Sequence, residues 1–60
     1  MFDLKQKRID KGMTQEQLAK MVGVVRTNIS NIECGYTRPS VDTAKLIANV
    51  LGFDWTEFFE

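Results

Sequence analysis

Apolar residues recur three and four positions apart along the whole chain, and no segment alternates between apolar and polar residues with a period of two. The first pattern is typical of helices with one buried face, and the second is typical of strands. A chain of 60 residues has room for one small hydrophobic core. The sequence therefore predicts a single all-α domain over residues 1–60, built as a compact bundle of five helices.

Capping residues and glycines predict where the first two helices begin and end. Asp3 has the side chain of a helix N-cap, with Gln6 three residues later to complete a capping box, and Gly12 offers a left-handed end to the first helix. Thr14 and Gln17 have the spacing of a capping box at the start of a second helix, which Gly23 closes after about two turns. The residues of the second helix expected to face the core are Leu18, Ala19, Met21 and Val22.

A third helix is expected to begin at Val25 or Arg26 and to end at Cys34, before Gly35. Only two or three residues around Gly23 separate it from the second helix. A turn of that length forces the two helices to cross steeply. One side of the third helix holds Val25, Ile29 and Ile32.

The remainder of the chain predicts a loop and two further helices. Pro39 cannot continue a helix, and Ser40 can cap a fourth helix that Gly52 ends. The segment "FDWTEFFE" predicts a last short helix with a capping box of Asp54 and Glu57. The apolar residues expected in the core here are Ala44, Leu46, Ile47, Ala48, Val50, Leu51, Phe53 and Phe58.

The side of the third helix that lies opposite its isoleucines is polar and almost uncharged. It holds Thr27, Ser30, Asn31 and Cys34, with Arg26 at one edge. These side chains donate or accept hydrogen bonds. In the major groove of DNA, Asn can pair with adenine, Arg with guanine, and Thr can contact thymine. A short helix, a tight turn and such a helix together have the layout of a DNA-reading helix-turn-helix, over residues 14–34 or so.

The segment "TQEQLAKMVGVVRTNISNIECG", with "LKQKRIDKGM" before it and "RPSVDTAKLIANVLGFDWTEFF" after it, resembles the lambda-repressor-like, or Xre-type, helix-turn-helix domains of phage and bacterial repressors. The resemblance covers nearly the whole chain. It implies sequence-specific binding of double-stranded DNA by the third helix. It also implies transcriptional regulation, most simply as a repressor.

The resemblance also implies roles for individual residues. Arg8 of the first helix and Glu33 of the third are expected to form a structural ion pair. Val25 stands where relatives commonly place a capping Ser or Thr, so either the helix starts differently or Val25 makes an apolar contact, for example with a thymine methyl. The expected base-reading residues are Val25, Arg26, Thr27 and Asn31. The expected phosphate-binding residues are Gln15, Asn28, Ser30, Tyr36, Thr37 and Arg38. Gln15 is also expected to brace the third helix.

Two aromatic residues near the end of the chain have two competing interpretations. Trp55 and Phe59 lie one helical turn apart in a chain too small to bury every aromatic side chain. They are expected to form a homodimer surface, and the alternative is that they close the core of a monomer. Dimerisation would suit a palindromic operator, because a two-fold dimer sets its recognition helices about one DNA turn apart.

The charge is unevenly distributed although the net charge is zero. Residues 1–38 hold seven Lys or Arg against four Asp or Glu, whereas residues 39–60 hold one against four. This split suggests one face for an anion. Net charge zero and the missing cap leave a second function open: a protein-binding adaptor or antitoxin-like module of the same fold, with little or no DNA binding.

Other classes of function lack their characteristic residues. The chain has no His and a single Cys34, so no metal site, cofactor or disulfide is expected. The sequence has no acid pair and no Gly-rich phosphate loop, so neither an enzyme nor a small-molecule substrate is expected. The stretch "MFDLKQKRIDKG" is charged from its third residue, and no apolar run approaches the ~18 residues of a membrane span. A cytoplasmic protein is therefore expected.

Overall fold

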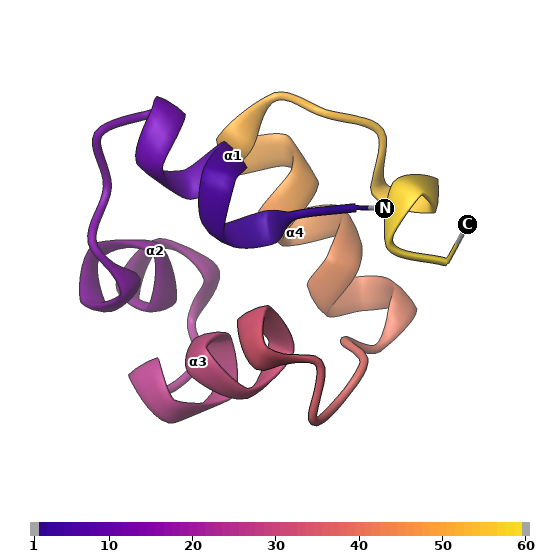
Figure 1. The fold of residues 1–60 in the computed structure, drawn as a ribbon, viewed down its shortest axis with the longest axis horizontal. Helices are drawn as coiled ribbons and strands as arrows, with labels where there is room; N and C mark the ends of the chain where they lie inside the picture. Colours follow the sequence, from indigo (N-terminus) through magenta and orange to yellow (C-terminus); the bar gives the residue numbers. More distant parts are fainter. Residues whose placement is uncertain (1, 60) are drawn as a thin grey trace.

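A computed structural model describes residues 2–59, which form four α-helices and a short 3-10 helix. The elements are α1 (Leu4–Asp10), α2 (Gln15–Val22), α3 (Arg26–Cys34), α4 (Val41–Leu51) and η1 (Trp55–Phe59) (Figure 1). No strand occurs between residues 2 and 59, so the predicted all-α class is confirmed. The fifth element is a 3-10 helix where the sequence predicted a further helix of unspecified type. Within the described range, none of the helices is long and apolar enough to cross a membrane.

Side chains cap the first two helices as the sequence predicted, with one difference. The Thr14 hydroxyl accepts from the backbone N–H of Gln17, whose side chain accepts from the N–H of Thr14, so the capping box of α2 is complete. Asp3 accepts from the backbone N–H of Gln6 at the start of α1. The Gln6 amide does not return to Asp3, because it donates instead to the Asp10 carboxylate.

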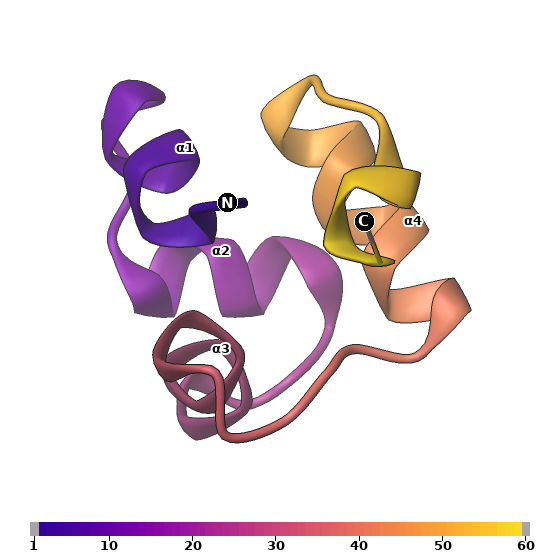
Figure 2. The same ribbon diagram turned by 45° about the vertical axis from the view of Figure 1, so that its right-hand side comes forward.

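The turn between α2 and α3 consists of three residues, of which Gly23 comes first. Gly23 has a φ of +86°, a left-handed conformation that other residues rarely adopt, and its N–H donates to the carbonyl of Ala19. Ala19 is buried, so its small side chain lets the helices approach closely. Figure 2 shows α2 lengthwise and α3 nearly end-on, which is the steep crossing predicted from the length of the turn.

The core contains one fully buried large side chain from each of three helices. Leu18 of α2, Ile29 of α3 and Ile47 of α4 are completely shielded from solvent. Around them lie further buried residues from α1 to α4, namely Leu4, Ala19, Val22, Ile32, Ala44, Ala48 and Leu51. The helices α2, α3 and α4 therefore each bury an apolar face, α1 contributes Leu4, and α3 is fixed to the bundle by its two isoleucines.

Three predicted apolar positions lie outside this core. Met21 of α2 is 64% exposed, Leu46 of α4 is 50% exposed, and Val25 at the start of α3 is 70% exposed. The predictions for Met21 and Leu46 as core residues were wrong. Both lie at the edge of an apolar stripe, and a domain of 60 residues has too small a core to cover the full width of every stripe.

Aromatic side chains join the two ends of the described chain. The rings of Phe2, Phe53 and Phe58 contact one another, with centroids 4.6 to 5.5 Å apart. Lys7 of α1 lies over the Phe53 ring, and its Nζ is 3.7 Å from a carboxylate oxygen of Glu57. Figure 1 shows the start of the chain beside η1. These contacts hold η1 against α1, although the two are far apart in sequence.

The predicted capping box of Asp54 and Glu57 does not form. The Asp54 carboxylate accepts from the backbone N–H and the hydroxyl of Thr56, and these hydrogen bonds hold the pKa of Asp54 below its ordinary value. Glu57 is paired with Lys7 instead. A tight local turn at Asp54 therefore begins a 3-10 helix.

Candidate nucleic-acid interface

The polar side of α3 faces away from the rest of the bundle. Figure 1 shows α3 at the edge of the molecule, with α2 and the following loop beside it. Ile29 and Ile32 on its inner side are buried. On the opposite side Arg26 and Thr27 are exposed, and Asn31 is half-buried. The expected phosphate contacts Asn28 and Ser30 are also half-buried on this helix. The helix therefore offers a polar surface held from behind by apolar packing.

The start of α3 lacks a side-chain cap. Val25 occupies the N-cap position with an extended backbone, and its side chain makes no hydrogen bond to the first turn. The helix thus begins where the sequence predicted. Because Val25 is exposed, its methyl groups are available to contact a ligand beside Arg26 and Thr27.

Replacing Val25 with Ser is expected to raise the free energy of unfolding by about 1 kcal/mol, because a hydroxyl would accept from an N–H group of the first turn. Urea unfolding of the two proteins measures the difference. The matched control is Val25→Ala, which removes the same methyl groups and adds no acceptor. Equal stabilities of the Ser and Ala variants would show that this helix start gains nothing from a cap.

A buried ion pair joins α1 to α3 directly behind this surface. The Nε of Arg8 donates to Oε2 of Glu33 at 2.6 Å, and a second guanidinium nitrogen donates to Oε1 at 3.2 Å. A third nitrogen donates to the carbonyl of Met13 at 2.7 Å. The hydrogen bond to Glu33 raises the pKa of Arg8 above its ordinary value although burial opposes this. The structure thus contains the pair that the resemblance implied.

Gln15, the first residue of α2, connects this pair to the polar side of α3. Its Nε2 donates to Oε1 of Glu33 at 3.0 Å, and its Oε1 accepts from Nη1 of Arg26 at 3.2 Å. Gln15 is half-buried at the helix start, where backbone N–H groups lack partners within the helix. A predicted phosphate-binding residue and a predicted base-reading residue therefore lie side by side.

No local pattern in the sequence predicts these two hydrogen bonds of Gln15. Its partners are 18 and 11 positions away along the chain, so helical spacing cannot reveal them. The resemblance implied that Gln15 braces the third helix and binds phosphate. A signal that could have been used is the chemical match between an amide and the opposite charges of Glu33 and Arg26.

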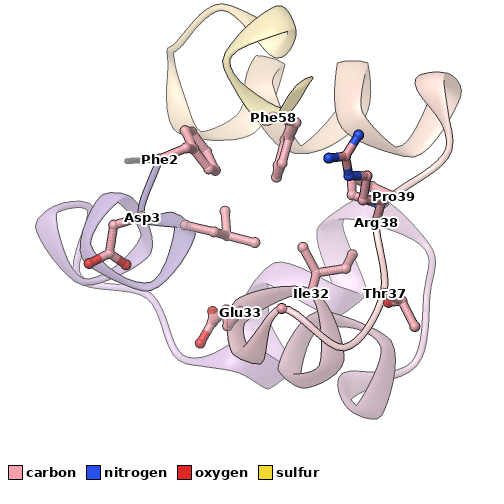
Figure 3. A pocket seen from close by; sticks show the side chains of 10 residues that line it. Phe2, Asp3, Ile32, Glu33, Thr37, Arg38, Pro39 and Phe58 are labelled. Atoms are coloured by element: carbon pink, nitrogen blue, oxygen red, sulfur yellow. The ribbon is translucent and has the colours of Figure 1, made fainter. Parts of the chain in front are cut away.

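The loop after α3 extends the exposed polar surface. Gly35 ends the helix in a left-handed conformation, and Tyr36, Thr37 and Arg38 after it are all exposed. Thr37 and Arg38 help to line an open hollow together with Ile32, Phe2 and Phe58 (Figure 3). The three predicted loop residues are thus accessible on the α3 side of the molecule.

Trp55 and Phe59 pack against each other in η1, at some distance in the chain from the residues described above. Their rings meet edge to face with centroids 6.1 Å apart, and Lys45 of α4 lies over the Trp55 ring at 5.2 Å. Trp55 is half-buried, whereas Phe59 is exposed. Neither side chain belongs to the buried core.

Comparison with known proteins identifies the fold. A family model described as helix-turn-helix matches residues 4–58. An uncharacterized HTH-type transcriptional regulator, YqaF of Bacillus subtilis, is 49% identical over 57 residues, which cover 95% of this chain and 75% of that protein. A second uncharacterized HTH-type transcriptional regulator, from Methanothermobacter thermautotrophicus, is 41% identical over 54 residues, covering 90% of this chain and 78% of that protein.

A phage protein is also similar. The ImmF control region 10 kDa protein of Bacillus phage phi105 is 39% identical over 51 residues, covering 85% of this chain and 57% of that protein. The family match and the names of the relatives confirm the predicted lambda-repressor-like domain and agree with the prediction of a DNA-binding transcriptional regulator. With a match from α1 to η1, the chain belongs to the helix-turn-helix family.

Proposed function

We propose that this chain binds double-stranded DNA sequence-specifically as one domain over residues 1–60, and that it represses transcription by covering promoter DNA. The observation that carries this proposal is the polar, nearly uncharged outer side of α3, which two buried isoleucines hold against the bundle. Such a helix fits the major groove, where base edges present hydrogen-bond donors and acceptors. This function would place the protein in the cytoplasm, as expected from its sequence.

Base recognition is assigned to the start and middle of α3. Arg26 has the donors to pair with a guanine, and Asn31 can pair bidentately with an adenine. Thr27 offers a hydroxyl and a methyl group, and the exposed Val25 offers methyl groups to a thymine. Thr27 and Asn31 lie on the side of the helix opposite its isoleucines, Arg26 lies at the edge of that side, and the exposed Val25 lies at the helix start.

Phosphate binding is assigned to the residues that flank this helix. Gln15 lies at the N-terminus of α2, where free backbone N–H groups also favour an anion. Its amide has a second N–H besides the one given to Glu33. The remaining assigned residues are Asn28, Ser30, Tyr36, Thr37 and Arg38. Contacts on both sides of α3 would fix its position in the groove.

A homodimer through Trp55 and Phe59 is the proposed assembly. The exposed Phe59 ring, already packed against Trp55, supports this assignment because aromatic side chains are enriched at protein interfaces. A two-fold dimer would place two copies of α3 about one helical turn of DNA apart. The proposed operator is therefore palindromic.

Selection of bound duplexes from a random pool, followed by binding of single-base-pair variants, tests this function. Replacing Arg26 or Asn31 with Ala is expected to weaken binding to the selected duplex by roughly 1 to 3 kcal/mol and to relax preference at one base pair each. The matched control is Asn49→Ala, an exposed Asn of α4 outside the assigned surface, which should leave binding unchanged.

Two outcomes would contradict parts of the proposal. An equal loss of affinity on every duplex would exclude base reading by the replaced residue. Selected duplexes with a single, non-palindromic site would contradict the two-fold dimer.

A further inference from the structure

Glu33 contacts both the buried Arg8 and Gln15. Gln15 in turn contacts Arg26, the proposed base-reading arginine. Oε2 of Glu33 accepts from Nε of Arg8, and its Oε1 accepts from Nη2 of Arg8 and from Nε2 of Gln15. The Glu33 side chain is 4% exposed. It therefore lies too deep to contact DNA itself, and it can act on DNA only through Gln15.

The Gln15 amide lies between two groups of opposite hydrogen-bonding character. A carboxylate only accepts hydrogen bonds and a guanidinium only donates them. The amide satisfies both partners in one orientation, with Nε2 toward Glu33 and Oε1 toward Arg26. A flipped amide would set oxygen against carboxylate and N–H against guanidinium. Glu33 therefore determines which atom Gln15 presents to Arg26.

The contact with Gln15 uses one nitrogen of Arg26 and leaves the others free. Nη1 donates to Gln15, and a guanidinium has five N–H donors in a fixed planar fork. The remaining donors can still reach the acceptors of a base. Because ordering a long side chain on binding costs free energy, an arginine held in advance loses less when it pairs with its base.

We propose that Glu33 is a positioning residue for DNA recognition: through the Gln15 amide it holds Arg26, and so it sharpens discrimination at the base pair that Arg26 reads. This inference rests on the proposed DNA-binding function. It gives the buried ion pair of Arg8 and Glu33 a role in specificity in addition to its role in the fold.

Two variants interrupt this chain of hydrogen bonds at different points. Glu33→Gln keeps one oxygen for Arg8 but offers an N–H to Gln15, whose amide must then turn around. Gln15→Met removes both contacts and leaves the buried pair intact. The readout is the ratio of affinities for the selected duplex and for duplexes changed at the base pair that Arg26 reads, with circular dichroism to establish folding.

Each variant is expected to lower this ratio about three- to tenfold, as loss of one side chain's preordering would. Ratios at the other base pairs should stay unchanged. In an Arg26→Ala background neither variant should lower the ratio further. The matched control is Gln6→Met, an exposed Gln of α1, which should leave every ratio unchanged.

Other results would overturn the inference. A purely structural Glu33 would give equal losses on all duplexes, or the same loss with and without Arg26. If Glu33→Gln does not fold, Glu33→Asp, which keeps the charge and shortens the side chain by one methylene, replaces it in the same comparison. If Arg26→Ala itself leaves the ratio unchanged, base reading by Arg26 fails and the inference fails with it. If Arg26→Ala lowers the ratio but the two variants do not, the inference alone is wrong.

Discussion

Replacing Glu33 with Ala is expected to lower the free energy of unfolding by about 3 to 5 kcal/mol, because it leaves the Arg8 guanidinium buried without its counter-charge. The Arg8 and Glu33 side chains are only 10% and 4% exposed, so water cannot replace the lost carboxylate. Among residues 2–59, the carbonyl of Met13 would remain as the only hydrogen-bond partner of the Arg8 guanidinium. Since small domains are stable by only about 5 to 15 kcal/mol, this loss removes much of the stability. Urea unfolding measures it.

The matched control is Glu16→Ala, which also removes one carboxylate of an ion pair. Glu16 lies 3.9 Å from Lys20 on the outside of α2, and its side chain is 67% exposed. Exposed pairs of this kind contribute about 0.3 to 0.5 kcal/mol. If Glu33→Ala and Glu16→Ala destabilise the protein equally, the buried pair does not have the structural role described here.

Replacing Ile29 with Ala is expected to lower the free energy of unfolding by about 2 to 5 kcal/mol. Ile29 is completely buried in the same core cluster as Leu18 and Ile47, so its removal leaves a cavity as well as losing apolar contacts. The same side chain holds α3 against the bundle, and the variant should therefore also bind DNA less tightly on every sequence. Thermal unfolding should show a decrease in Tm of about 4 to 8 °C for each kcal/mol lost.

Ile9→Ala provides the comparison for this substitution. The Ile9→Ala substitution removes the same side-chain volume at a position in α1 that is 48% exposed. The expected loss is about 1 kcal/mol or less, because half of the side chain is already in water. Similar losses at the two positions would mean that Ile29 is not the anchor of α3.

Local features of the sequence were sufficient to predict most of the helix ends. The capping box of Thr14 and Gln17 and the left-handed Gly23 and Gly35 involve residues a few positions apart. Propensity and hydrogen bonding at such short range leave few alternatives, which is why α3 lies where the sequence placed it. The steep crossing of α2 and α3 followed from the length of their connection.

Features that depend on distant residues could not be predicted from local patterns. Met21 and Leu46 have the same helical spacing as buried neighbours, and only the packing of the whole domain leaves them exposed. Glu57 could have capped the last helix, but Lys7 of α1 provides it with a charged partner. The folded chain, and not the spacing of its residues, determines these contacts.

The candidate site also contains both features that the sequence could predict and a feature that it could not. The polar side of α3 followed from the periodicity of its isoleucines, and the pairing of Arg8 with Glu33 followed from the resemblance to a known family. Neither source placed the Gln15 amide between Glu33 and Arg26. That arrangement requires the start of α2 to lie against the side of α3, which depends on the tertiary structure.

The central claim is that this helix-turn-helix domain binds duplex DNA through contacts with its phosphates and bases. Titration with duplex DNA of random sequence at increasing salt concentrations tests it most directly. The logarithm of the affinity should fall linearly with the logarithm of the salt concentration with a slope of several units, since each neutralised phosphate contributes about −0.9. A flat response, or no binding at low salt, would contradict the claim and would favour a protein-binding adaptor of the same fold.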